Sequence, residues 1–312
     1  MKARKFFVLS GEHPELGRDE VAAIAKAYDP RSQFESEHRL LLANTSASLE
    51  KIVRRASFVR AAGEVAGTFE SIPDGSFPIP RPHTFACKAV NLSSNPVDTR
   101  ALEREAGALF AKRWNSKVAL SNPNLVLYLI ITDTARYLGY SPPMAVPPRP
   151  NKPYKHPHEL SWKLARCMVN LSGVMEGQTL CDPFCGTGTI LLEGESMGIG
   201  SVGIDLDMRM CRISERNMAR NSYEPRIINS SFDYVRKIEE RIDAVVTDLP
   251  YGTASRSSHP PKKLLRDLLL VVPSKKRLVL VYKKGLGIED LDWSKKYEIF
   301  RHKSLTRVVV VR

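Results

Sequence analysis

The chain has 312 residues, of which 43% are hydrophobic and 26% charged, a composition typical of a globular protein with two or three domains. Its longest apolar run, at 125–131, is too short to cross a bilayer, and the apolar stretch near the N-terminus is shorter than a secretory signal. We therefore expect a cytoplasmic protein with no membrane partner. The 47 Lys and Arg outnumber the 34 Asp and Glu, and the net charge of +13 is spread over both halves. Such a field attracts polyanions, most often nucleic acid, although basic proteins without such a partner have the same composition.

The five cysteines are odd in number and scattered along the chain, which argues against a disulfide framework. Cys181 and Cys185 are four residues apart, but no Cys-x-x-Cys or His-x-His pair completes a zinc site around them. We expect no metal.

The N-terminal half alternates short strands and helices. Apolar periodicity predicts, in chain order, a strand over 4–9, helices over 17–28 and 46–67, a strand over 84–92, a helix over 98–114 and two extended pieces within 117–132. Asn122-Pro123 separates the two pieces, because proline cannot lie inside a central strand. The turn-rich segment 72–82 indicates a boundary.

A proline-rich segment, 141–157, follows. It holds seven prolines in 17 residues, which favours an extended and semi-rigid spacer. It also carries Arg149, Lys152, Lys155 and His156. The segment is therefore either a passive linker or a stiff arm that lies along a phosphate backbone.

From residue 159 onward, strands alternate with helices. The predicted strands are 178–182, 201–207, 226–233, 242–248 and 277–285, and the predicted helices are 161–174, 188–198 and 208–221. This alternation predicts a doubly wound parallel sheet, with an antiparallel hairpin over 297–311 at its edge.

The sequence "CDPFCGTGT" (181–189) reads as a strand, a glycine turn and a helix. Gly186 and Gly188 let the backbone approach a ligand closely. The full dinucleotide fingerprint is absent, because Leu191 stands where its third glycine would be, and the P-loop lysine is missing as well. The glycine pair alone is therefore a weak signal.

Two acids strengthen that signal. Asp205 lies about 20 residues beyond the glycine turn, where an acid can bind a ribose diol. Asp233 ends the third predicted strand and is placed to accept from an adenine amino group. Considered alone, either acid is more simply interpreted as an exposed loop residue. Together with Asp248, at the end of the next strand, they converge on one crevice.

These motifs resemble those of a class I S-adenosylmethionine-dependent methyltransferase. The segments "DPFCGTGTILLE" and "TDLPYG" (247–252) are similar to those of archaeal tRNA guanine-N2 methyltransferases. "KPYKHPHELSWKLARCMVNL" (152–171) is similar to the segment before the glycine loop in the enzymes that act on guanosine 10. Residues 81–140 resemble a THUMP domain, and 1–80 the ferredoxin-like segment before it.

The resemblance implies an α/β fold. A class I (Rossmann-like) methyltransferase domain is expected over 159–312. A proline-rich linker over 141–158 would join it to an N-terminal α+β RNA-binding region, in which a ferredoxin-like domain over 1–80 precedes the THUMP domain over 81–140.

The resemblance also assigns roles to residues. Those implied to bind the cofactor, S-adenosyl-L-methionine, are Asp182, Pro183, Phe184, Gly186, Gly188, Asp205 and Asp233. In the acceptor motif, Asp248 would accept one N–H of a planar amino group, and the carbonyl of Leu249 or Pro250 the other. Such a group is a poor nucleophile, and accepting its protons returns the lone pair to nitrogen. Tyr251 would stack on the flipped base.

One residue departs from the family's Asp/Asn-Pro-Pro-Tyr/Phe pattern. Leu249 replaces the first proline, so the backbone carbonyl remains but the restraint on φ is lost. Outside the family context, "TDLPYG" reads as an ordinary strand-to-loop turn. The loop after it carries basic residues that would border the acceptor pocket, either as phosphate contacts or as plain surface charge: Arg256, His259, Lys262, Lys263 and Arg266. Arg166 is a further candidate for RNA contact.

The implied function is methyl transfer to N2 of a guanosine in tRNA, at position 10, once or twice. The alternatives are guanosine 6 of tRNA, adenine N6 in RNA, a protein glutamine, and an RNA-binding protein whose methyltransferase domain is inactive. The implied partner is tRNA, and a small activating subunit is a further possibility.

Overall fold

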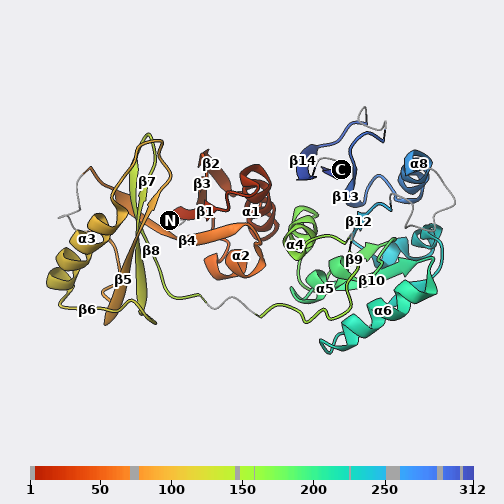
Figure 1. Ribbon diagram of the computed structural model, residues 1–312, viewed down its shortest axis with the longest axis horizontal. Helices are drawn as coiled ribbons and strands as arrows, with labels where there is room; N and C mark the ends of the chain where they lie inside the picture. Colours follow the sequence, from red (N-terminus) through yellow and green to blue (C-terminus); the bar gives the residue numbers. More distant parts are fainter. Residues whose placement is uncertain are drawn as a thin grey trace. The chain divides into compact units, whose positions relative to one another are not determined.

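The computed structural model describes residues 4–70, 77–144, 148–157, 159–224, 226–250, 261–286, 291–302 and 305–312 (Figure 1). Tyr251, Arg256 and His259 lie outside these residues. The chain divides into two compact units. The first comprises Met1–Arg54 and Phe58–Pro147, and the second Arg55–Ser57 and Pro148–Arg312.

The first unit is built on one mixed sheet. In chain order its elements are β1 (Arg4–Leu9), α1 (Pro14–Tyr28), β2 (Gln33–Glu37), β3 (Leu40–Asn44), α2 (Leu49–Arg55), β4 (Val59–Thr68), β5 (Thr84–Asn91), α3 (Thr99–Trp114), β6 (Lys117–Val118), β7 (Leu125–Ile131) and β8 (Arg136–Ser141). The eight strands lie in the order β2-β3-β1-β4-β8-β7-β5-β6. β5 pairs in parallel with β6 and β7, and the other pairs are antiparallel. The segments predicted as two domains thus share one sheet.

Strand β7 is buried on both of its faces. All seven of its residues are buried. Alternate side chains point to opposite faces, so Leu127 joins a cluster with Phe110 and Trp114 of α3, whereas Tyr128 joins another with Phe6. Such a continuous apolar run is typical of a strand with no solvent face.

The helix predicted over 46–67 is wrong in its second half. α2 ends at Arg55, and the chain continues as β4, which pairs with both β1 and β8. The local Ala-rich pattern favoured a helix, but tertiary pairing on both edges overrides that propensity. Gly63 shows how tightly the strand is enclosed, because a Cβ there would lie 2.3 Å from the carbonyl oxygen of Tyr140.

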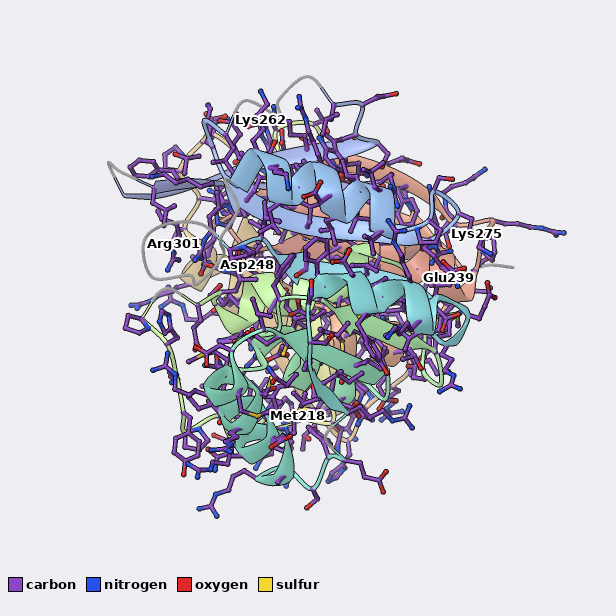
Figure 2. The ribbon with its side chains drawn as sticks, turned by 90° about the vertical axis from the view of Figure 1, so that its right-hand side faces the viewer. Met218, Glu239, Asp248, Lys262, Lys275 and Arg301 are labelled. Atoms are coloured by element: carbon purple, nitrogen blue, oxygen red, sulfur yellow. The ribbon has the colours of Figure 1, made fainter. Side chains whose placement is uncertain are left out.

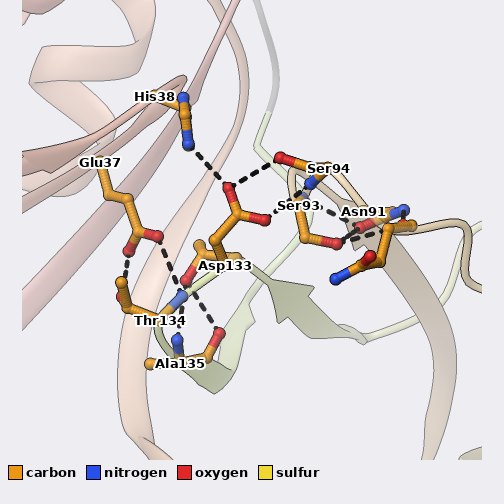
Figure 3. A network of polar contacts seen from close by, with 10 residues as sticks. Glu37, His38, Asn91, Ser93, Ser94, Asp133, Thr134 and Ala135 are labelled. Carbon is orange, nitrogen blue, oxygen red and sulfur yellow. Dashed lines mark hydrogen bonds and ion pairs between the residues drawn. The ribbon is translucent and has the colours of Figure 1, made fainter.

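A polar network, here called the polar clamp, ties three connections of the first unit together (Figure 3). Its members are Glu37, His38, Ser94, Asp133 and Thr134. Asp133 accepts from the backbone N–H of Ser94 at 2.7 Å and contacts Nε2 of His38 at 2.9 Å. Glu37 accepts from the Thr134 hydroxyl at 2.6 Å. The clamp lies at the surface, and these bonds, first of all the one from Ser94, hold the pKa of Asp133 below its usual value.

The second unit is the doubly wound sheet that the sequence predicts. Its elements are α4 (Trp162–Leu171), β9 (Thr179–Asp182), α5 (Thr189–Glu195), β10 (Gly200–Asp205), α6 (Met208–Ala219), β11 (Ile227–Asn229), η1 (Phe232–Tyr234), α7 (Val235–Ile238), η2 (Glu239–Arg241), β12 (Ala244–Asp248), α8 (Pro261–Val271), β13 (Arg277–Lys283), β14 (Lys295–His302) and β15 (Leu305–Val311). The strand order is β11-β10-β9-β12-β13-β15-β14, and only the pairs that involve β15 are antiparallel.

The order in which the chain adds strands to this sheet reverses at β9. The chain runs from β9 to β10 and β11 on one side, and from β12 to β13 on the other. Because parallel crossovers are right-handed, α5 and α6 cover one face and α8 the other. Figure 2 shows α8 with Lys262 on one side and Met218 of α6 on the other, with Asp248 between them. Ligands of such sheets bind where the carboxyl ends of strands meet at the reversal.

Two sequence predictions for this unit need correction. The third strand is only Ile227–Asn229, so Asp233 does not end a strand but lies in the 3-10 helix η1. The segment 261–267, predicted as loop, is the start of α8, because Leu264, Leu265 and Leu268 form an apolar stripe that packs into the core. No helix within the described residues has both the length and the apolarity needed to cross a membrane.

Candidate active site

A cavity of about 930 Å³ opens at the reversal point, at the carboxyl ends of the parallel strands. Nine of the eleven predicted site residues line it: Asp182, Pro183, Phe184, Gly186, Asp205, Asp233, Asp248, Leu249 and Pro250. Gly188 does not line it, and Tyr251 lies outside the described residues. The structure thus brings together most of the residues that the motifs selected.

The glycine turn is held by the acid of the neighbouring strand. The backbone N–H of Gly186 donates to Asp205 Oδ2 at 2.9 Å, and the N–H of Asp207 donates to Asp205 Oδ1 at 2.8 Å. Burial raises the pKa of Asp205, and these two bonds oppose the rise. Gly186 has a φ of +51°, and a Cβ there would meet nothing within 4 Å. The turn therefore has open space at Gly186, and its backbone is held by Asp205.

Gly188 serves packing in this structure. Its φ is +82°, and a Cβ would lie 2.5 Å from the Ser214 hydroxyl of α6. The residue is the N-cap of α5 and lets the turn press against α6. Contact between Gly188 and a cofactor stays a prediction.

Asp233 reaches the cavity even though it is not at a strand tip. η1 follows β11 directly and places Phe232 and Asp233 on the cavity wall. The Ser231 hydroxyl donates to Asp233 Oδ2 at 3.0 Å. The rings of Phe184 and Phe232 lie 5.5 Å apart and are tilted by 41°, and both line the cavity together with Asp233.

Asp182 connects the first strand of the sheet with the acceptor strand. Its Oδ1 accepts from the Thr247 hydroxyl at 2.6 Å and from the backbone N–H of Phe184 at 3.1 Å. Asp182 is 2% exposed, and burial raises its pKa to about 7 against the effect of those bonds. The sequence did not single out Thr247, although its position one residue before the acceptor motif was a usable signal.

Asp248 ends β12, and one of its carboxylate oxygens meets neither water nor a donor from the described part of the chain. Oδ1 is shielded from solvent and has no hydrogen-bond partner among the described residues. Burial raises the pKa of Asp248 to about 7, and the positive charge of Arg307 opposes the rise. A shielded acceptor with free capacity is costly unless a ligand donor completes it. Arg307, a buried residue of β15, was missed because it lies 59 positions away in the sequence.

The structure accounts for the leucine in the acceptor motif. The N–H of Leu249 donates to the Val281 carbonyl of β13 at 2.9 Å, a bond that proline could not make. The Leu249 side chain is fully buried in the core cluster with Val245 and Leu264. The hydrogen bond and burial replace the lost restraint on φ.

The proline-rich segment is anchored at its end. Lys152 Nζ contacts the Glu159 carboxylate and donates to the hydroxyls of Thr187 at 2.8 Å and Thr189 at 2.6 Å. The sequence analysis placed Lys152 either in a passive linker or in an arm along a phosphate backbone, and it did not select Glu159. Here Lys152 is directed into the second unit instead.

Other basic candidates differ in exposure. Arg166 is 6% exposed and pairs with Glu193 at 2.7 Å, so it is not a free surface group for RNA. Lys262, Lys263 and Arg266 are exposed on α8, and Lys263 pairs with Asp267 at 3.3 Å.

Potential metal ligands within the described residues gather at the polar clamp. Glu37, His38 and Asp133 bring three ligand atoms within 4.8 Å of one another. All five cysteines are buried free thiols. At the cavity, no three such residues of the described part of the chain bring their ligand atoms this close together.

Comparisons with known proteins agree with this architecture. A family model described as "RMKL-like, methyltransferase domain" matches residues 149–283. The chain is 33% identical over 334 residues to the tRNA (guanine(10)-N2)-dimethyltransferase of Methanothermobacter thermautotrophicus, with 97% of each chain covered. It is 25% identical to the protein of the same name from Methanocaldococcus jannaschii, with 98% of each covered. The crystal structure of TrmN from Thermus thermophilus aligns over 99% of both chains with a TM-score of 0.60 and 18% identity, which shows a shared fold.

Proposed function

The chain belongs to the tRNA (guanine(10)-N2)-dimethyltransferase family, and from that premise we propose that it methylates N2 of guanosine 10 in tRNA, twice, with S-adenosylmethionine as donor. The observation that carries the proposal is Asp248. Its Oδ1 is shielded and has no partner among the described residues, and Asp248 lines the cavity together with Asp182, Asp205 and Asp233.

The cavity fits the cofactor in the order of the strands. Asp233 follows β11, Asp205 ends β10, the glycine turn follows β9 and Asp248 ends β12. The adenine amino group of the cofactor can therefore meet Asp233, its ribose diol can meet Asp205, and its sulfonium can meet the open glycine turn. The open face of Gly186 leaves room for such a ligand. The bound cofactor supplies an electrophilic methyl group.

The acceptor residues raise the nucleophilicity of the guanine amino group. Its lone pair is delocalised into the ring, so the nitrogen attacks poorly. Asp248 accepts one N–H, and the carbonyl of Leu249 or Pro250 accepts the other, which returns electron density to nitrogen. The backbone of Asp248 and Leu249 is held by pairing with β13 and by the bond from the Leu249 N–H to the Val281 carbonyl, so little reorganisation is needed when the base arrives. Tyr251 stacks on the base and holds it in line.

Substrate binding is assigned to the first unit. The net charge of +13 favours encounter with the tRNA backbone. In this proposal the segments 1–80 and 81–140 are the ferredoxin-like and THUMP parts of the tRNA-binding region, and 141–158 is the linker. The base leaves its stack to enter the cavity, because its amino group is otherwise out of reach.

The test uses purified protein, S-adenosylmethionine and unmodified tRNA transcripts, followed by nucleoside mass spectrometry. We expect N2,N2-dimethylguanosine in the wild-type reaction and a large loss of it with Asp248→Ala. A transcript with adenosine at position 10 and uridine at 25 keeps the helix paired and should not be modified. Product at guanosine 6, or N6-methyladenosine, would replace the assigned site while leaving methyl transfer intact.

Lack of product needs a second measurement. Wild-type protein that binds S-adenosylhomocysteine but modifies no transcript, and then acts after addition of a cell extract, would indicate an activating subunit. Wild-type protein that binds no cofactor would overturn the proposed activity and favour an RNA-binding protein with an inactive domain.

A further inference from the structure

The end of the proline-rich segment belongs to a closed polar network beside the glycine turn. Lys152 has a side chain only 11% exposed, and its ammonium group contacts Glu159, Thr187 and Thr189. A lysine is seldom buried without such partners. The positive charge of Lys152 is therefore balanced within this network.

Glu159 connects this network to the cavity. Its Oε2 also accepts from the Thr187 hydroxyl at 2.8 Å and from the backbone N–H of His156 at 3.0 Å. Glu159, His156, Thr187 and Thr189 all line the cavity, whereas Lys152 does not. Burial acts to raise the pKa of Glu159, but the contacts with Lys152 and the N–H of His156 outweigh it and keep the pKa below its usual value. The cavity wall thus carries an ionised carboxylate that Lys152 orients from behind.

Strand order determines which part of the cofactor meets that carboxylate. The adenosine end is assigned to Asp233 and Asp205, which follow β11 and β10, and the methyl acceptor to Asp248 on β12. β9 lies between β10 and β12. The sulfonium of the bound cofactor would therefore lie near the turn after β9, and the amino-acid chain attached to it would extend from there. Thr187 belongs to that turn, and Glu159 is bonded to it.

We propose that Lys152 is a positioning residue that holds Glu159 against the α-ammonium group of the cofactor's methionine end. Glu159 then supplies selectivity for nucleosides that carry an amino-acid chain over those that lack one. The inference rests on the proposed function, since it takes S-adenosylmethionine as the cofactor. It also explains why the network includes the end of the proline-rich segment, since Lys152 is the cation that Glu159 needs to remain ionised in a half-buried position.

The experiment compares two ligands that differ in the amino-acid chain, which bears the α-ammonium group of the proposed contact. S-adenosylhomocysteine carries the amino-acid chain, and 5′-methylthioadenosine lacks it. Isothermal titration of Lys152→Met should show a loss of about tenfold in affinity for S-adenosylhomocysteine and a change under about twofold for 5′-methylthioadenosine, as expected for one charge-assisted contact. Lys155→Met makes the same change at an exposed lysine three positions away and should alter neither affinity.

A double-mutant cycle tests whether Lys152 acts through Glu159. We expect Glu159→Gln to produce the selective loss by itself, and Lys152→Met to add little in that background. Additive losses would overturn the positioning role. Thr187→Val removes a neutral donor to Glu159 and should give a smaller loss of the same selectivity, which keeps the test valid if Lys152→Met does not fold.

The ligand pattern separates this inference from the proposed function. Equal losses for both ligands, or no loss for S-adenosylhomocysteine, would overturn the inference even if wild-type protein methylates tRNA. Wild-type protein that binds both ligands with equal affinity would do the same. Wild-type protein that prefers S-adenosylhomocysteine but modifies no transcript would instead contradict the proposed activity alone.

Discussion

Two threonine–carboxylate hydrogen bonds, one in each unit, have the same length and opposite surroundings. In the polar clamp, Thr134 donates to Glu37 at 2.6 Å at the surface. Beside the cavity, Thr247 donates to Asp182 at 2.6 Å, and Thr247 is fully buried. Water can replace the first bond when it breaks but cannot reach the second. Geometry alone therefore does not indicate which bond matters, and burial decides it.

The same contrast appears in the pKa values of the acids. At Glu37 burial is the largest single influence and acts to raise the pKa, but the hydrogen bonds from Thr134 and Thr132 together outweigh it and keep the pKa below its usual value. At Asp133 the bond from the Ser94 N–H is the largest influence, and it lowers the pKa. Burial raises the pKa of both Asp182 and Asp248 to about 7. Carboxylates with raised pKa values in a cavity are the expected mark of a functional site, whereas the clamp is a structural tie.

The largest expected effect is the loss of Asp248. Asp248→Ala removes a preorganised acceptor for the amino group, so kcat/KM for tRNA should fall by about 10²–10³-fold. Affinity for S-adenosylhomocysteine, measured by titration calorimetry, should change little. A variant that keeps more than about a tenth of wild-type activity would show that the carbonyls of Leu249 and Pro250 suffice.

The raised pKa of Asp248 predicts opposite pH trends for activity and stability. Activity requires the ionised acceptor, so kcat/KM should rise as pH increases through about 7. A folded-state pKa above the unfolded value adds stability that is complete at acid pH and is lost as pH rises through about 7. Asp182 adds to the second trend in the same direction.

Asp248→Asn shows how much of each pH profile belongs to Asp248 and how much to Asp182. The amide oxygen still accepts a hydrogen bond but does not titrate, so activity should be reduced and less dependent on pH. Pre-steady-state methylation and thermal unfolding, both from pH 5 to 9, measure the two trends. Retention of the full wild-type slope would assign it to another group.

Thr247→Val tests the buried member of the threonine pair. The substitution keeps the shape and removes the donor to Asp182, so the free energy of unfolding should fall by about 1–3 kcal/mol at neutral pH. Methylation should fall by about tenfold, because Asp182 and Asp248 follow adjacent strands. Thr247→Ser keeps a hydroxyl and should restore most of both. Denaturant unfolding and the tRNA assay measure the effects.

Thr134→Val tests the exposed member and should have the smallest effect. Loss of the bond to Glu37 should change the free energy of unfolding by less than about 0.5 kcal/mol, because water replaces the donor. Methylation of tRNA should stay near the wild-type rate. A loss as large as that of Thr247→Val would mean that the clamp does more than tie the connections of the first unit.

The comparison also explains what the sequence could predict. The alternation of strands and helices after residue 159, the glycine turn, and the acids Asp182, Asp205 and Asp248 at strand ends all follow from local patterns. A parallel sheet places the carboxyl ends of its strands together, so motifs at those ends converge without further information.

Other features required the tertiary structure. β4 looked helical because a single segment cannot show that two strands will pair with it. Asp233 kept its place on the cavity wall although it lies in η1 and not at a strand end, because a short strand and a 3-10 turn reach as far as a longer strand.

The sequence by itself determined the methyltransferase fold, the glycine turn and the acceptor motif, because each depends on residues that are neighbours in the chain. Only the tertiary structure decided that Thr247 donates to Asp182, that Arg307 lies near enough to Asp248 to oppose the rise of its pKa, and that Lys152 orients Glu159. The physical reason is that a buried polar group pairs with the partner that packing places beside it, and residues far apart in the sequence give no local signal that they will become such partners.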